Sequence, residues 1–84
     1  MRKIAYSKDT LKTLRRIPAN ISAIIRAKIE QFANDPVSLA NKVIQMQGRP
    51  GYSRMRVGDW RVIFSEDQIV LAIVRVAPRG GAYD

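Results

Sequence analysis

The side chains in this sequence best suited to chemistry are its ten arginines and a tyrosine at position 83. Arginine forks bind phosphate oxygens in a bidentate geometry, and arginine outnumbers lysine here two to one. The chain has no histidine and no cysteine, which excludes a histidine general base, a thiol nucleophile and the usual zinc ligands. Its seven acidic residues are dispersed along the chain, so we expect no metal site and no cofactor.

Arginines with a tyrosine suit phosphoryl transfer within RNA. There the 2′-hydroxyl attacks the neighbouring phosphate, so the substrate supplies its own nucleophile. The protein must align the attack and stabilise the charge that develops on phosphorus. Neighbouring cations stabilise a tyrosinate, so Tyr83 is a candidate base beside Arg79 and Arg61. Arginine is a poor acid at neutral pH, and charge stabilisation should therefore contribute more than proton transfer.

The net charge of +8 predicts a polyanionic partner. Nucleic acid is favoured over a membrane surface, and a basic protein kept in solution by its charge is the plainer alternative. No segment has the length and apolar character of a membrane span, and no signal-peptide pattern follows the start. We therefore expect a cytoplasmic protein without a membrane partner.

The length fits a single domain over residues 1–84. The side chains of residues 2–6 alternate in character as they do in a strand. Ser7 can cap a helix that follows, and Pro18 breaks that helix or starts the next one. Residues 19–33 have the period of a helix. Its expected buried stripe consists of Ile21, Ile24, Ile25, Ile29 and Phe32.

After Gly51 the apolar residues recur with a period of two. Residues 37–50 show no clear period and suggest a short helical turn near Leu39 followed by a loop. Residues 52–57, 60–65 and 68–76 are predicted strands, the last ended by Pro78, before an irregular tail from 79 to 84. This order predicts an α+β fold: strand, helix, helix and a three-strand antiparallel meander, with both helices packed on one sheet face.

A two-residue turn at 58–59 would place Arg56 opposite Arg61 and Arg54 opposite Ile63. Directly opposed residues share a face, so one face carries arginines while the other faces the helices. The helix-facing set is Met55, Val57, Trp60, Val62 and Phe64, and the other set is Tyr52, Arg54, Arg56 and Arg61. Two opposed arginines repel, and a bound anion would remove the conflict; a solvated strand face is the alternative. A second two-residue turn at 66–67 would place Ala72 opposite Arg61.

The segments YSRMRVGDWRVIF and IVLAIVRVAPRGGAY resemble the C-terminal half of the RelE/ParE toxin superfamily. The resemblance implies a small domain with helices on one face of an antiparallel sheet. It also implies the function of the RelE-like branch, whose members cleave mRNA in the ribosomal A site to a 2′,3′-cyclic phosphate. The partners it implies are the ribosome, mRNA and a cognate antitoxin that inhibits the toxin.

The resemblance also implies roles for individual residues, which are assigned by matching positions of this sequence to those of the family. Arg61 would grip the scissile phosphate, Arg54 would stabilise the transition state, and Arg79 would lie near the leaving oxygen. Tyr83 would be the base or would orient it, and Arg56 would extend the basic surface. The helix charges Lys8, Lys12, Arg15 and Arg16 could contact ribosomal RNA. Tyr52 occupies a position that is lysine in some RelE toxins.

Two other functions stay open. A ParE-like toxin would bind and inhibit DNA gyrase without cleaving RNA. A plain RNA-binding module of the RRM kind would need aromatic side chains exposed on central strands, whereas Trp60 and Phe64 are expected to face the helices.

Overall fold

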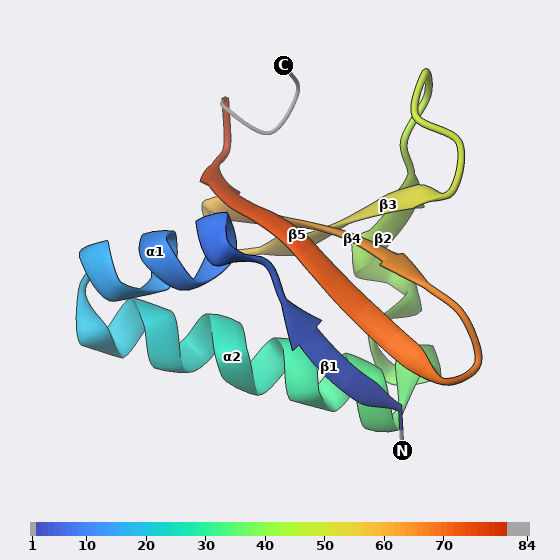
Figure 1. The fold of residues 1–84 in the computed structure, drawn as a ribbon, viewed down its shortest axis with the longest axis horizontal. Coiled ribbons are helices and arrows are strands. Elements are labelled where there is room, and N and C mark those ends of the chain that lie inside the picture. Colours follow the sequence, from blue (N-terminus) through green and yellow to red (C-terminus); the bar gives the residue numbers. More distant parts are fainter. Residues whose placement is uncertain (1, 81–84) are drawn as a thin grey trace.

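The computed structural model describes residues 2–80 as a five-stranded sheet with two helices packed on one face (Figure 1). The strand order is β1-β5-β4-β3-β2; β1 pairs with β5 in parallel, and the other neighbours are antiparallel. The predicted α+β architecture is confirmed. The elements are β1 (Lys3–Tyr6), α1 (Lys8–Arg16), α2 (Ala19–Asn34), the 3₁₀ helix η1 (Pro36–Lys42), β2 (Val43–Gln45), β3 (Tyr52–Val57), β4 (Trp60–Glu66) and β5 (Val70–Pro78).

The N-terminus of α1 is tied to β5 by side-chain hydrogen bonds. Ser7 caps the helix, because its Oγ accepts a hydrogen bond from the Thr10 backbone N–H at 3.1 Å. The Ser7 hydroxyl also lies 2.9 Å from the Val74 carbonyl oxygen, and the Thr10 hydroxyl donates to the Ile73 carbonyl at 3.2 Å. Val74 is the residue that the β4–β5 ladder skips, so these hydroxyls bind carbonyls at an irregular point of the sheet.

Both helices and the inner face of the sheet enclose one main core. Phe32 of α2 packs against Phe64 of β4 with the rings tilted by 57° and their centroids 5.0 Å apart, and both side chains are buried. The predicted stripe is confirmed at Ile25 and Ile29, but Ile24 is 52% exposed and was wrongly included. A helix turns by about 100° per residue, so consecutive isoleucines cannot both face the core squarely.

None of the helices between residues 2 and 80 is long and apolar enough to cross a membrane.

The strand predictions need two corrections. A fifth strand, β2, forms within the segment expected to be a loop, pairing Val43 with Met55 and Ile44 with Arg54. Three residues are too short to show a period of two. β5 runs from Val70 to Pro78 and not over residues 68–76, although Pro78, opposite Trp60, is its last residue as predicted. β1 pairs only with the first part of β5, so the missing N–H of Pro78 breaks no ladder there.

The register of β5 also differs from the prediction. Arg61 lies opposite Ala77 and not Ala72. The β4–β5 turn takes in three residues, Asp67 to Ile69, and the bulge at Val74 adds another shift. The Asp67 carboxylate accepts hydrogen bonds from the backbone N–H groups of Ile69 and Val70, both at 2.7 Å, and this stabilises the longer turn.

Candidate functional site

The β3–β4 hairpin places three arginines on the sheet face opposite the helices. Arg56 pairs directly with Arg61, and Arg54 pairs with Ile63, as the sequence predicted. The alternate residues Met55 and Val62 are buried in the core. The turn between the strands needs a positive φ, which Gly58 supplies at 57°. The outer face of this hairpin is therefore a row of cations held on a rigid, well-packed support.

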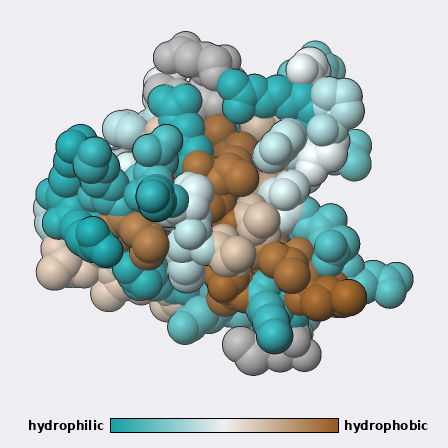
Figure 2. Space-filling model, viewed as in Figure 1, coloured by the Kyte–Doolittle hydropathy of each residue, from teal (hydrophilic) through white to brown (hydrophobic). Residues whose placement is uncertain are grey.

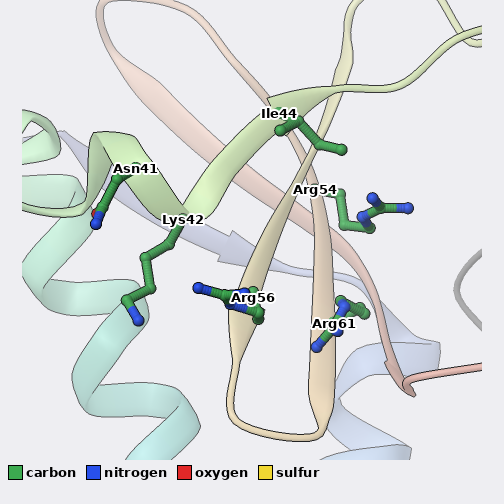
Figure 3. Close-up of a pocket in the computed structure, with 6 residues that line it drawn as sticks. All are labelled: Asn41, Lys42, Ile44, Arg54, Arg56 and Arg61. Atoms are coloured by element: carbon green, nitrogen blue, oxygen red, sulfur yellow. The ribbon is translucent and has the colours of Figure 1, made fainter.

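These arginines line a hollow of about 190 Å³ with residues from the segment before β3. Lys42 is the last residue of η1 and brings a fourth cation to the hollow (Figure 3). In that view Arg56 extends on the side of Lys42, and Arg54 extends on the other side of the hairpin. The lining residues are Asn41, Lys42, Ile44, Arg54, Arg56 and Arg61. None is acidic, so the hollow suits an anion with several negatively charged oxygens.

Arg61 is the most firmly held of these side chains. It is only 8% exposed, and its Nη1 donates hydrogen bonds to the carbonyl oxygens of Gly58 at 3.0 Å and Trp60 at 2.9 Å. Within residues 2–80, no carboxylate forms an ion pair with Arg61; the described ion pair joins Arg2 and Glu66. A buried guanidinium without a counter-charge is costly, and an anion bound in the hollow would offset this cost.

Arg79 lies at the hairpin end of the sheet but does not line the hollow. Its backbone N–H donates to the Asp59 carbonyl oxygen at 2.8 Å, which brings the end of β5 next to the β3–β4 turn. Its side chain is exposed. Tyr83, the predicted base, lies outside the described residues.

The helix charges proposed to bind RNA belong to a different surface. All four side chains are exposed on α1, which packs against β5 on the opposite side of the sheet from the hollow. Lys12 and Arg16 line a separate groove between α1 and the end of β5, together with Arg75. The structure thus brings Arg54, Arg56 and Arg61 together, but not Lys8, Lys12, Arg15 or Arg16 with them.

Three residues that line the hollow were not predicted from the sequence: Asn41, Lys42 and Ile44. Their segment had no period, and their place in the hollow depends on β2 pairing with β3. The available signal was Lys42 before the apolar pair Val43-Ile44, which is too short to specify a partner strand. No group of three or more His, Cys, Asp or Glu side chains in the described part of the chain could hold a metal ion.

The chain matches a family model described as the ParE toxin of type II toxin–antitoxin systems, parDE, over residues 4–83. It is 29% identical to toxin RelE3 of Methanocaldococcus jannaschii over 84 residues, covering 98% of this chain and 96% of that one. The RelE–RelB complex of Pyrococcus horikoshii contains a chain with 26% identity and a TM-score of 0.77, covering 95% of this chain and 97% of that chain. The RelBE complex of E. coli shares the fold, with 15% identity, a TM-score of 0.75 and coverage of 93% and 96%. This chain therefore belongs to the RelE/ParE superfamily of toxins from type II toxin–antitoxin systems.

Proposed function

We propose that this toxin is an endoribonuclease that cleaves mRNA in the ribosomal A site without a metal ion. The observation that carries the proposal is Arg61, buried and held by two carbonyls in a hollow whose other charged residues are cations. Such a hollow is complementary to a phosphate that gains negative charge during the reaction. Preorganised donors of this kind stabilise a transition state without reorganising when it forms.

The proposed reaction uses the 2′-hydroxyl of the RNA as the nucleophile. The bond from O2′ to phosphorus forms as the bond from phosphorus to O5′ breaks, leaving a 2′,3′-cyclic phosphate and a 5′-hydroxyl end. Arg61 and Arg54 bind the non-bridging oxygens, where the charge develops, and Arg56 adds to the same field. Tyr83 takes the proton from the 2′-hydroxyl. Arg79 stabilises the charge on the leaving O5′, which takes up a proton from solvent.

The solved relatives support a proposal about the partners of this toxin. RelE chains of Pyrococcus horikoshii and E. coli are solved as complexes with RelB antitoxins. We propose a cognate antitoxin for this toxin too. The exposed cations of α1 lie away from the hollow, on a surface that suits contacts with ribosomal RNA phosphates while mRNA occupies the hollow.

One observation favours a second candidate function. The matched family model is described by the ParE toxin, and a ParE-like protein would bind and inhibit DNA gyrase. Gyrase binding is an interaction function, so it would not require a cationic hollow complementary to a phosphate. We rank the ribonuclease function first for this reason.

A primer-extension assay on mRNA held in programmed ribosomes separates the two functions. Naked mRNA is the control, and the toxin must be folded and free of antitoxin. Cuts within the A-site codon of ribosome-bound mRNA alone are the expected result. Absence of cuts in both samples, together with loss of gyrase supercoiling activity on adding the toxin, would replace the ribonuclease function with the ParE-like one.

A further inference from the structure

An aromatic residue, Tyr52, precedes the arginines of β3 on the same strand. Residues 52, 54 and 56 alternate onto the same face, because successive side chains of a strand point to opposite faces. The rise of a strand places Tyr52 roughly 6–7 Å from Arg54 along β3. This separation is close to that of neighbouring nucleotides in an extended single strand. Tyr52 is 37% exposed, so a substantial part of the side chain is open to solvent.

Tyr52 lies in its own depression, distinct from the arginine hollow. The depression is about 430 Å³ and is lined by Arg49, Pro50, Tyr52, Val74 and Arg75. The turn before β3 folds Arg49 next to the tyrosine, since the Tyr52 backbone N–H donates to the Arg49 carbonyl at 3.1 Å. The outline of the molecule is notched between this turn and the β4–β5 turn (Figure 2). An aromatic side chain thus shares an open depression with two arginines from different elements.

The neighbours of Tyr52 across the sheet leave room above the surface. Tyr52 pairs with Ser65 of β4, and Ser65 pairs with Ala72 of β5. In the next row toward the hairpin turn, Arg54 pairs with the larger Ile63. The side chains beside Tyr52 therefore rise less above the sheet than the isoleucine beside Arg54. A planar base has space to lie over them, and the arginines of β3 and β4 begin directly next to this space.

We propose that Tyr52 is a stacking platform for one base of the RNA, next to the nucleotide whose phosphate lies between Arg54 and Arg61. Arg49 and Arg75 bind phosphates on either side of that base. The inference rests on the proposed function, because it takes single-stranded RNA as the ligand. Base stacking on an aromatic side chain tolerates any base, so Tyr52 contributes affinity and register but no strong sequence preference. A lysine at this position, as in some RelE toxins, would contact a phosphate instead.

The test measures binding of the free toxin to a short 2′-O-methyl oligonucleotide, which cannot be cleaved because its 2′-oxygens carry no proton. Fluorescence anisotropy at one fixed salt concentration gives the affinity for wild type, Tyr52→Ala and Tyr52→Phe. Tyr52→Ala should weaken binding about tenfold, whereas Tyr52→Phe should stay within about twofold of wild type, because the ring does the stacking. Val37→Ala, a change at an exposed apolar residue of η1, is the matched control and should bind like wild type.

Oligonucleotides with one abasic position complete a double-mutant cycle. One abasic position should weaken wild type by about the same factor as Tyr52→Ala and cause no further loss in that variant. Additive losses at every position, or a loss in Tyr52→Phe equal to that in Tyr52→Ala, would overturn the stacking role. Primer extension on ribosomes tests the proposed function separately. Cleavage by a wild type that shows no coupling removes only the platform, and coupling without cleavage removes only the ribonuclease.

Discussion

Arg56 and Arg61 lie directly opposite each other across β3 and β4, and only one of them is buried. Arg61 is held by backbone carbonyls, whereas Arg56 is exposed at the rim of the hollow. Two like charges at such a pair destabilise a hairpin. We therefore expect the pair to reduce the stability of the free toxin, and a bound phosphate to reverse the effect.

Replacing Arg56 with glutamate should separate stability from function. Arg56→Glu turns a repulsive cross-strand pair into an attractive one, so the free energy of unfolding should rise by about 0.2–1 kcal/mol. RNA binding should weaken, because the hollow loses a cation and gains an anion. Chemical denaturation and RNA titration of the same preparation measure the two effects. A less stable variant would show that Arg56 has a favourable contact in the free toxin.

Arg61→Ala should remove most of the cleavage activity. By analogy with the loss of one oxyanion donor, the cost is about 3–4 kcal/mol of transition-state stabilisation, or roughly 10²–10³-fold in rate. Lys28→Ala is a charge-matched control on α2, away from the hollow. Single-turnover cleavage on ribosomes gives the rates. A decrease of less than about tenfold would place Arg61 away from the scissile phosphate.

Tyr83→Phe tests the proposed base. Removing only the hydroxyl should lower the cleavage rate by about 10²–10⁴-fold and leave ribosome binding unchanged, because the ring is retained. Cosedimentation with ribosomes measures binding, and single-turnover kinetics measures the rate. Equal rates in the two proteins would exclude Tyr83 as the base and leave charge stabilisation by the arginines as the main contribution.

Ser7→Ala should destabilise the fold without touching the hollow. The change removes the cap of α1 and the hydroxyl beside the Val74 carbonyl, at a cost of about 1–2 kcal/mol. Chemical denaturation gives the free energy of unfolding, and Ser7→Thr, which keeps a capping oxygen, is the conservative control. If Ser7→Ala and wild type unfold at the same denaturant concentration, the hydrogen bonds of the Ser7 hydroxyl contribute nothing to stability.

Asp67 should make stability depend on acid pH. Hydrogen bonds from the backbone N–H groups of Val70 and Ile69 lower the pKa of this carboxyl below its ordinary value of 3.8. Its contribution is then fully present above the unfolded-state pKa and is lost as pH falls through the lower folded-state pKa. Thermal unfolding between neutral and strongly acid pH, on wild type and Asp67→Asn, measures the effect. A variant with the same acid dependence as wild type would contradict it.

The local pattern of the sequence determined the helices, the hairpin and the face on which its arginines lie. A two-residue turn at Gly58-Asp59 sets the register of β3 against β4, and the period of two then assigns every side chain of the hairpin to a face. The separation of Arg56 and Arg61 from Met55 and Val62 therefore followed from residues close together in the chain.

Tertiary structure alone decided what surrounds those arginines. The β4–β5 turn and the bulge at Val74 set the partner of Arg61 as Ala77, because each extra residue shifts the register. The segment before β3 shows no period, so only its pairing with β3 brings Lys42 to the hollow. A sequence pattern records which face a side chain takes, whereas its neighbours depend on contacts between segments far apart in the chain.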